Sequence, residues 1–373
     1  MANPRKYRAD QVGSLLRPPA LLQARAEHAA GRLDEGALRN AEDAAIRDVL
    51  VLQQNTGIDV LTDGEFRRSD FRAGLADAVE GMLTTTGSSV WHSAEGDKAI
   101  PVKFWHVAAK LQQKRRITEH EATFLRRSTS APVKVTLISP GFMAGRSFKP
   151  GVTDQFYPTV RELADELATI TRNEIEALIA DGVQYIQLDN PGYAFFLDPK
   201  NREKLKTSGQ DPDRAFENVL ATDLAAINGI RKPDGVRIAI HICRGNNASF
   251  WLNEGNYAPI AERLFNTLPV DRFLLEYDDA RSGGFEPLRF VPKGKVVVLG
   301  LISTKTPVLE DADALLGRID EAAKYIDSDD LAISPQCGFA THAEGGNNLT
   351  VDQERRKLEL TADVARRYWG PEL

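Results

Sequence analysis

The chain has little cysteine, no long hydrophobic run and no run of charge of one sign. No apolar stretch is long enough for a signal peptide or a membrane span, so we expect a cytoplasmic protein without a membrane partner. The formal net charge is −6 without a basic block, which argues against a nucleic-acid partner. Cys243 and Cys337 are the only cysteines among the 373 residues. In the cytoplasm we expect both to be reduced and free for metal binding or burial. A small-molecule substrate is the remaining expectation.

The composition is that of a globular protein, with 42% hydrophobic and 27% charged residues. Short β-branched runs alternate with longer helical patterns, which predicts parallel βα units. Eight strands are expected, at residues 11–15, 58–65, 133–139, 185–190, 236–243, 272–278, 295–303 and 331–337. This order predicts one α/β domain over residues 1–373, a (β/α)8 TIM barrel.

One segment does not fit the alternation of strands and helices. Residues 84–131 are too many for a βα loop and carry Trp91, Phe104 and Trp105 among many charges. We therefore expect an inserted arm over the C-terminal mouth of the barrel. These aromatic residues either face that mouth or pack a small core of the arm itself.

Polar residues stand at the carboxyl ends of most expected strands, where the chemistry of such barrels gathers. These positions are costly to bury unless the side chains are paired or bind a ligand. The residues concerned are Ser14, Asp63, Glu65, Asp189, His241, Cys243, Glu276, Asp278 and Cys337.

Four of these residues suggest a metal site. His241 and Cys243 are two apart on one strand, so both side chains point to the same side. Such a pair alone is more often a buried structural feature than a ligand pair. Glu276 and Cys337, from other strand ends, complete a set of ligands that selects zinc over magnesium or calcium. A site of this kind suits the activation of an incoming thiol as a nucleophile.

The same positions resemble the cobalamin-independent methionine synthases. The resemblance covers nearly the whole chain, but only the C-terminal catalytic barrel of the long two-barrel enzymes. It rests on Val12-Gly13-Ser14, Asp63-Gly64-Glu65, Gln187-Leu188-Asp189, His241-x-Cys243, Glu276 and Cys337-Gly338. It implies that His241, Cys243, Glu276 and Cys337 bind zinc. It also implies that Ser14, Glu65 and Asp189 hold the amino-acid end of homocysteine, which receives a methyl group to give methionine.

The chain departs from this family where the methyl donor would bind. Asn190 follows Asp189 where the long enzymes have an acid, and Lys305 takes the place of a histidine thought to serve proton transfer. Lys305 is thus a candidate catalytic residue, although an unperturbed lysine, with a pKa near ~10.4, is a weak proton shuttle. The donor stays open between a methylfolate, a methylated corrinoid protein as partner, and another small methyl compound.

Two alternatives remain from the sequence. The architecture also resembles epoxyalkane:coenzyme M transferases, which would need a basic pocket for a sulfonate, whereas Glu65 and Asp189 suit an ammonium group. A barrel that only binds zinc or a thiol amino acid is the second alternative. His342 and the glycine-rich loop at residues 344–348 follow Cys337 and could contact substrate.

Overall fold

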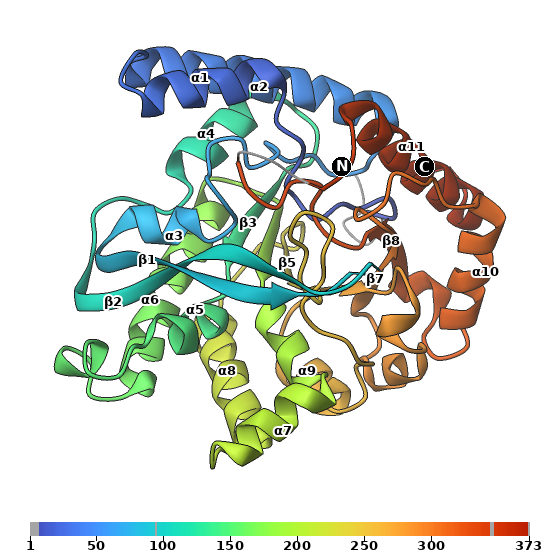
Figure 1. Ribbon diagram of the computed structural model, residues 1–373. Coiled ribbons are helices and arrows are strands. Elements are labelled where there is room, and N and C mark those ends of the chain that lie inside the picture. The colour runs from blue at the N-terminus through green and yellow to red at the C-terminus, as the bar shows by residue number, and fades with distance from the viewer. Residues whose placement is uncertain (1–6, 94, 344–346, 372–373) are drawn as a thin grey trace.

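The computed structural model describes residues 7–93, 95–343 and 347–371, and it shows a mixed α/β fold built on a parallel sheet (Figure 1). Six parallel strands pair in the order of the sequence. Almost every strand residue is buried, which is typical of parallel strands covered on both faces. The strands are β3 (Lys134–Ile138), β4 (Tyr185–Asp189), β5 (Arg237–Ile242), β6 (Arg272–Glu276), β7 (Val296–Ile302) and β8 (Leu331–Pro335).

Helices lie around the outside of these strands (Figure 1). The longest one after β3, α6, shows why they form: the Thr159 side chain accepts a hydrogen bond from the Glu162 amide at its start, and leucines recur on its buried face. The α-helices are α1 (Pro19–Ala29), α2 (Glu35–Thr56), α3 (Ala73–Ala78), α4 (Glu119–Ser128), α5 (Pro140–Ser147), α6 (Val160–Ala180), α7 (Pro199–Thr207), α8 (Pro212–Ile227), α9 (Ala261–Thr267), α10 (Ala312–Ala322) and α11 (Val351–Trp369).

The first two expected strands, residues 11–15 and 58–65, are wrong as strands. Among the described residues, single bridges take their place, between Ala9, just before the first segment, and Ile333 of β8, and between Leu61 and Val133 beside β3. Side-chain acceptors replace the missing strand ladder. The Gln11 amide donates to the Asp10 carboxylate at 2.7 Å, and the Thr62 amide donates to the Gln53 side chain at 2.9 Å. Backbone groups satisfied in this way no longer need a neighbouring strand.

The two edges of the sheet are nevertheless connected through these segments. The Asp10 amide donates to Ile333 O at 2.9 Å, and the Lys134 amide donates to Leu61 O at 2.8 Å. Between them, the Asp59 amide donates to Ala9 O at 3.0 Å. The six strands therefore confirm the parallel βα pattern, whereas a closed eight-stranded barrel stays a prediction.

The expected arm is mainly a β-hairpin. β1 (Val79–Trp91) and β2 (Lys98–Gln113) pair antiparallel, and the hairpin crosses in front of the parallel strands (Figure 1). It begins five residues before the expected boundary at 84, and α4 follows it within the expected range. A bridge between His92 and Trp251 joins the hairpin to the loop after β5.

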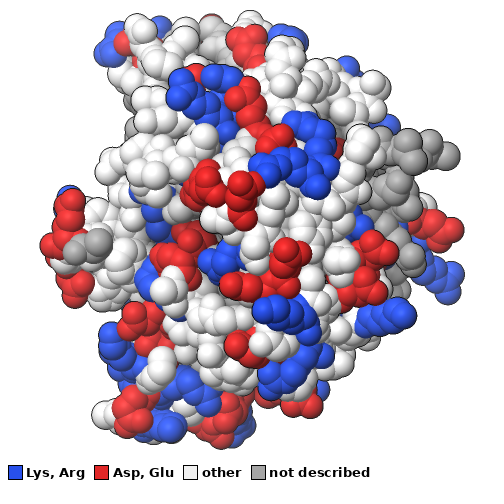
Figure 2. Space-filling view, turned by 90° about the vertical axis from the view of Figure 1, so that its right-hand side faces the viewer, with Lys and Arg blue, Asp and Glu red and all other residues white. Residues whose placement is uncertain are grey.

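Acidic and basic residues are intermingled on the face shown in Figure 2. Within the described ranges, no helix is both long enough and apolar enough to cross a membrane.

A buried ionic network lies inside the sheet. The ammonium group of Lys134 on β3 lies 2.6 Å from the Asp10 carboxylate and 2.9 Å from the Gln187 side-chain oxygen, and Lys134 and Asp10 are fully buried. The Tyr185 hydroxyl donates to Asp10 at 2.7 Å, and Arg272 lies 3.5 Å from the same carboxylate. Burial, and to a smaller extent the charge of Arg272, lowers the pKa of Lys134, whereas Asp10 favours its charged form.

Replacing Lys134 with methionine should therefore destabilise the fold by about 3–5 kcal/mol, because the fully buried Asp10 loses its closest cation. Urea unfolding measures the change. Lys324→Met is the matched control, because Lys324 is exposed after α10 and should change the free energy of unfolding by less than about 0.5 kcal/mol. Equal stabilities for the two variants would contradict this account of the network.

Candidate metal and substrate site

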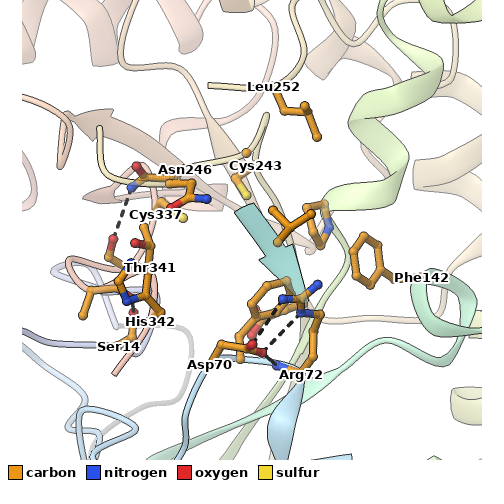
Figure 3. Close-up of a pocket in the computed structure, with 18 of the residues that line it drawn as sticks. Ser14, Asp70, Arg72, Phe142, Cys243, Asn246, Leu252, Cys337, Thr341 and His342 are labelled. Atoms are coloured by element: carbon orange, nitrogen blue, oxygen red, sulfur yellow. Dashed lines mark hydrogen bonds and ion pairs between the residues drawn. The ribbon is translucent and has the colours of Figure 1, made fainter. Parts of the chain in front are cut away.

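A cavity of about 290 Å³ opens between the carboxyl ends of the strands and the β1–β2 hairpin. Of the seven residues that the family resemblance assigns to zinc or homocysteine, it contains all but Glu276: Ser14, Glu65, Asp189, His241, Cys243 and Cys337. Several of the lining side chains are shown in Figure 3, with the sulfur atoms of Cys243 and Cys337 close to each other. Trp91 and Phe104 of the hairpin also line this cavity.

Three of these residues form a cluster that could hold a metal ion. His241 is on β5, Cys243 follows that strand directly, and Cys337 follows β8. Their ligand atoms all lie within 4.8 Å of one another. Neither ring nitrogen of the buried His241 has a hydrogen-bond partner within the described ranges. Buried polar atoms are rarely left unpaired, so the cluster fits a metal ion that prefers nitrogen and sulfur ligands.

The two cysteines differ in acidity. The contact with Cys337, and after it the nearby His241, lowers the pKa of the Cys243 thiol well below its usual value despite burial. The same contact, together with burial, raises the pKa of the Cys337 thiol. The deprotonated thiolate is the form of cysteine that binds metals, and a lowered pKa favours this form.

Glu276 is not part of this cluster. It ends β6 and is fully buried, but its carboxylate accepts hydrogen bonds from the Lys305 ammonium group at 3.1 Å and from the Arg244 amide. Lys305 also lies 3.3 Å from Asp278. Burial would lower the pKa of Lys305, but Asp278 and Glu276 outweigh it and raise the pKa to about 12. Neither Glu276 nor Lys305 lines the cavity.

Glu65 has a backbone conformation that few residues other than glycine adopt. Its φ angle is 58°, and its amide donates to the Asp63 carboxylate at 2.9 Å. The Glu65 side chain accepts from the Thr136 hydroxyl at 2.7 Å and lies 3.7 Å from Arg68. Such local strain tends to persist where the surrounding structure fixes a functional side chain.

Ser14 lies on the loop before α1. Its hydroxyl donates to Ala340 O at 2.7 Å, which joins this loop to the segment after Cys337. A Cβ atom on Gly338 would collide with the Ser14 hydroxyl, so only glycine fits beside it. The Cys337-Gly338 motif thus supplies the thiol and also allows the Ser14 loop to pack closely against it.

Asp189 ends β4 and is paired in the sheet with His241 of β5. Its carboxylate accepts a hydrogen bond from the Gln187 side chain at 2.8 Å, and Gln187 in turn contacts Lys134. Burial raises the pKa of Asp189 to about 7, although His241 and the Gln187 hydrogen bond act in the opposite direction. A cationic group in the cavity would favour the ionised form.

The Ser14 loop is also held from outside the cavity by Glu354 of α11. This buried carboxylate accepts from the Leu16 amide at 2.8 Å, while its other oxygen has no partner within the described ranges. Burial raises the pKa of Glu354 from 4.5 to about 8, although the Leu16 amide and the charge of Arg17 act in the opposite direction. The folded protein therefore holds this proton more tightly than the unfolded chain.

This shift predicts a pH effect on stability. The contribution of the protonated Glu354 is fully present below pH 4.5 and is lost as the pH rises to about 8, a change on the order of a few kcal/mol at ~1.4 kcal/mol per unit. Glu354→Gln keeps a neutral side chain, so its free energy of unfolding should exceed that of the wild type increasingly between pH 5 and pH 8. Urea unfolding at several pH values measures this, and parallel pH curves for the two proteins would contradict it.

Sequence reasoning missed the cations of the cavity. Arg72, Lys103 and Arg146 all line it, and none stands at the end of an expected strand. The only signal was the inserted arm, which supplies Lys103. His342 lines the cavity as expected, but residues 344–346 of the glycine-rich loop lie outside the described ranges.

A parallel α/β fold with a His-Cys-Cys cluster in a cavity at the strand ends defines an enzyme with a candidate thiol-rich metal site. Residues 9–366 match the family model described as "Cobalamin-independent synthase, Catalytic domain". The chain therefore belongs to the cobalamin-independent methionine synthase family of methyltransferases, as the sequence motifs indicated.

Similar proteins cover most of the chain. The uncharacterized protein YxjH of Bacillus subtilis is 38% identical over 97% of this chain and 95% of its own length. A methionine synthase of Pyrococcus abyssi is 27% identical, with 88% of this chain and 85% of that protein covered. A solved structure from Listeria monocytogenes, assigned as a vitamin-B12-independent methionine synthase, has a TM-score of 0.74 and 26% identity, with 98% of both chains covered.

Proposed function

We propose that this protein transfers a methyl group to the thiol of homocysteine and so forms methionine. Family membership and the relatives named methionine synthase support the reaction. The observation that carries the proposal is the cavity itself, because its three metal-ligating side chains share one space with Ser14, Glu65 and Asp189. We also propose that the sheet and its two bridged segments act together as a (β/α)8 barrel.

We propose zinc as the cofactor, with His241, Cys243 and Cys337 as ligands. Imidazole and thiolate ligands favour zinc over the harder metal ions, and the unpaired His241 nitrogens fit such a role. Zinc bound there would favour the deprotonated, nucleophilic form of a substrate thiol. Glu276 remains the proposed fourth ligand, and it would have to give up its contact with Lys305 to serve as one.

The side chains around this cluster would bind and orient the amino acid. Glu65 and Asp189 are acids that suit the ammonium group of homocysteine. Ser14 could donate to its carboxylate, in exchange for the present hydrogen bond to Ala340 O. Lys305 remains the proposed donor-side residue, but with its two acidic partners it would act as a cation rather than as a base.

The methyl donor is a methylfolate or another small methyl compound in this proposal. The description of the family as cobalamin-independent weighs against a corrinoid protein as partner. A corrinoid donor is therefore included only as one arm of the test.

A methyl-transfer assay tests the proposal. Purified protein supplied with zinc is incubated with homocysteine and, in separate reactions, with methylfolates carrying one or several glutamates, methylcobalamin, or S-methylmethionine. Methionine should form with at least one donor and should stop when a chelator removes the metal. No methionine with any donor from protein shown to hold zinc would contradict the proposal. The remaining functions would then be a barrel that only binds zinc or a thiol amino acid, or an enzyme similar to the epoxyalkane:coenzyme M transferases.

A further inference from the structure

The cavity contains an arginine that has no acidic partner among the described residues. Arg146, near the end of α5, lines the cavity, and its side chain is accessible to solvent. No ion pair or hydrogen bond to its guanidinium group is found within the described ranges of the chain. An arginine inside a cavity without a carboxylate beside it has unused hydrogen-bond donors.

Aromatic rings pack against the guanidinium groups of Arg146 and Arg72 in the cavity. Arg146 lies over the ring of Phe142 at 4.5 Å from its centroid, and Phe142 contacts Phe71 at 5.9 Å. Arg72 lies over the Trp105 ring of the hairpin at 4.5 Å. Stacking of this kind fixes the plane of a guanidinium group and leaves its edges free for a ligand. Figure 3 shows Arg72 paired with Asp70, with Phe142 in the same view.

The basic residues of the cavity, Arg72, Lys103 and Arg146, are not all neutralised by acidic partners among the described residues. Arg72 is neutralised, because its guanidinium group binds Asp70 at 3.1 and 3.2 Å and donates to Lys103 O at 3.1 Å. Lys103 is a second exposed cation that lines the same cavity as Arg146. The protein atoms that surround Arg146 in the cavity, and after them the charge of Arg72, lower the pKa of Arg146 to about 10, although its side chain still reaches solvent. An anion bound here would relieve the repulsion between these like charges.

We propose that Arg146, together with Lys103 and the Asp70–Arg72 pair that line the same cavity, binds a carboxylate or phosphate group of the methyl donor; this inference rests on the proposed function. The flat guanidinium fork matches both anions. Glu65 and Asp189 line the same cavity and would repel an anion, so they favour the ammonium group of homocysteine instead. In this proposal the acidic residues of the cavity bind the thiol substrate, and its basic residues bind the donor.

Binding of simple anions tests this site without turnover. Glutarate, as a carboxylate probe, and inorganic phosphate are titrated by calorimetry into the full-length protein supplied with zinc. The wild type should bind at least one of them, and Arg146→Gln should weaken that binding about 10-fold or more. Arg146→Lys should keep part of the affinity, because it retains the charge but not the fork. Arg231→Gln, at an exposed arginine outside the cavity, is the control and should match the wild type.

A second titration decides which substrate the site serves. Saturating homocysteine should leave the affinity for the anion within about 2-fold, since the proposal assigns the two ligands to different residues of the cavity. Competition between them, or displacement of the anion by 2-mercaptoethanesulfonate through Arg146, would overturn the donor assignment in favour of a thiol with an acidic group. Binding that is absent in the wild type, or unchanged in Arg146→Gln, would overturn the anion site itself. If homocysteine fails to bind while Arg146-dependent anion binding persists, the proposed function falls and the anion site stands.

Discussion

Replacing Cys337 with alanine is expected to remove bound zinc and to abolish methyl transfer. The wild type should carry about one zinc per chain, the content expected for a single site of this kind. Cys337 supplies one of three ligand atoms in the cluster, and the remaining His241 and Cys243 lie on one strand end and cannot surround an ion. Removing a residue that hydrogen-bonds to a metal ligand typically lowers activity ~10–100-fold. Removing a ligand itself should lower activity by more than that. Elemental analysis and the methyl-transfer assay measure both effects.

Ser334→Ala is the matched control for this variant. Ser334 lies on β8, three residues before Cys337, and is buried; within the described ranges its hydroxyl donates to the neighbouring Pro335 O and does not reach the cluster. It should keep both zinc and activity. If Cys337→Ala retains as much zinc as Ser334→Ala, the metal lies elsewhere and the proposed ligand set is wrong.

Asp189→Asn is expected to weaken homocysteine binding strongly. The substitution keeps the size of the side chain but removes the charge proposed to hold the ammonium group. A hydrogen bond to a charged group contributes about 1.5–3 kcal/mol, so we expect KM for homocysteine to rise about 10- to 150-fold. Glu65→Gln should act in the same direction. Steady-state kinetics at saturating donor separates this effect from a change in kcat.

Asp198→Asn provides the control for that effect. Asp198 is also buried, but it caps α7 by accepting a hydrogen bond from the Lys200 amide, and it does not line the cavity. Asparagine caps helices about as well as aspartate, so KM should stay unchanged. If Asp189→Asn alters KM no more than Asp198→Asn does, Asp189 does not bind the substrate.

The sequence predicted the later strands of the fold well, because β3 to β8 are short runs rich in apolar and β-branched residues, as is typical of parallel strands buried on both faces. The first two strands could not be predicted in the same way. Side chains such as Asp10 and Gln53 take the backbone hydrogen bonds there, and hydrophobic patterning does not reveal that choice. The hairpin of the arm was visible only as a segment too long for a loop.

The site shows the same division. Strand ends located the His241, Cys243 and Cys337 cluster, because residues at the carboxyl ends of parallel strands meet at one edge. The positive φ angle of Glu65 left no sequence signal. The ion pair between Glu276 and Lys305 left no sequence signal either, because several charged side chains lie close together and the sequence does not show which of them pair. The basic residues of the cavity were missed because Arg72 and Arg146 lie outside the strand ends.

X-ray absorption at the zinc edge, with and without homocysteine, tests the central claim most directly. The claim is that His241, Cys243 and Cys337 hold zinc in the cavity where the substrate thiol binds. Without substrate, the spectrum should show nitrogen and sulfur neighbours at about 2.0 and 2.3 Å. Saturating homocysteine should add one sulfur neighbour. A spectrum that homocysteine leaves unchanged, from protein shown to bind it, would contradict the claim.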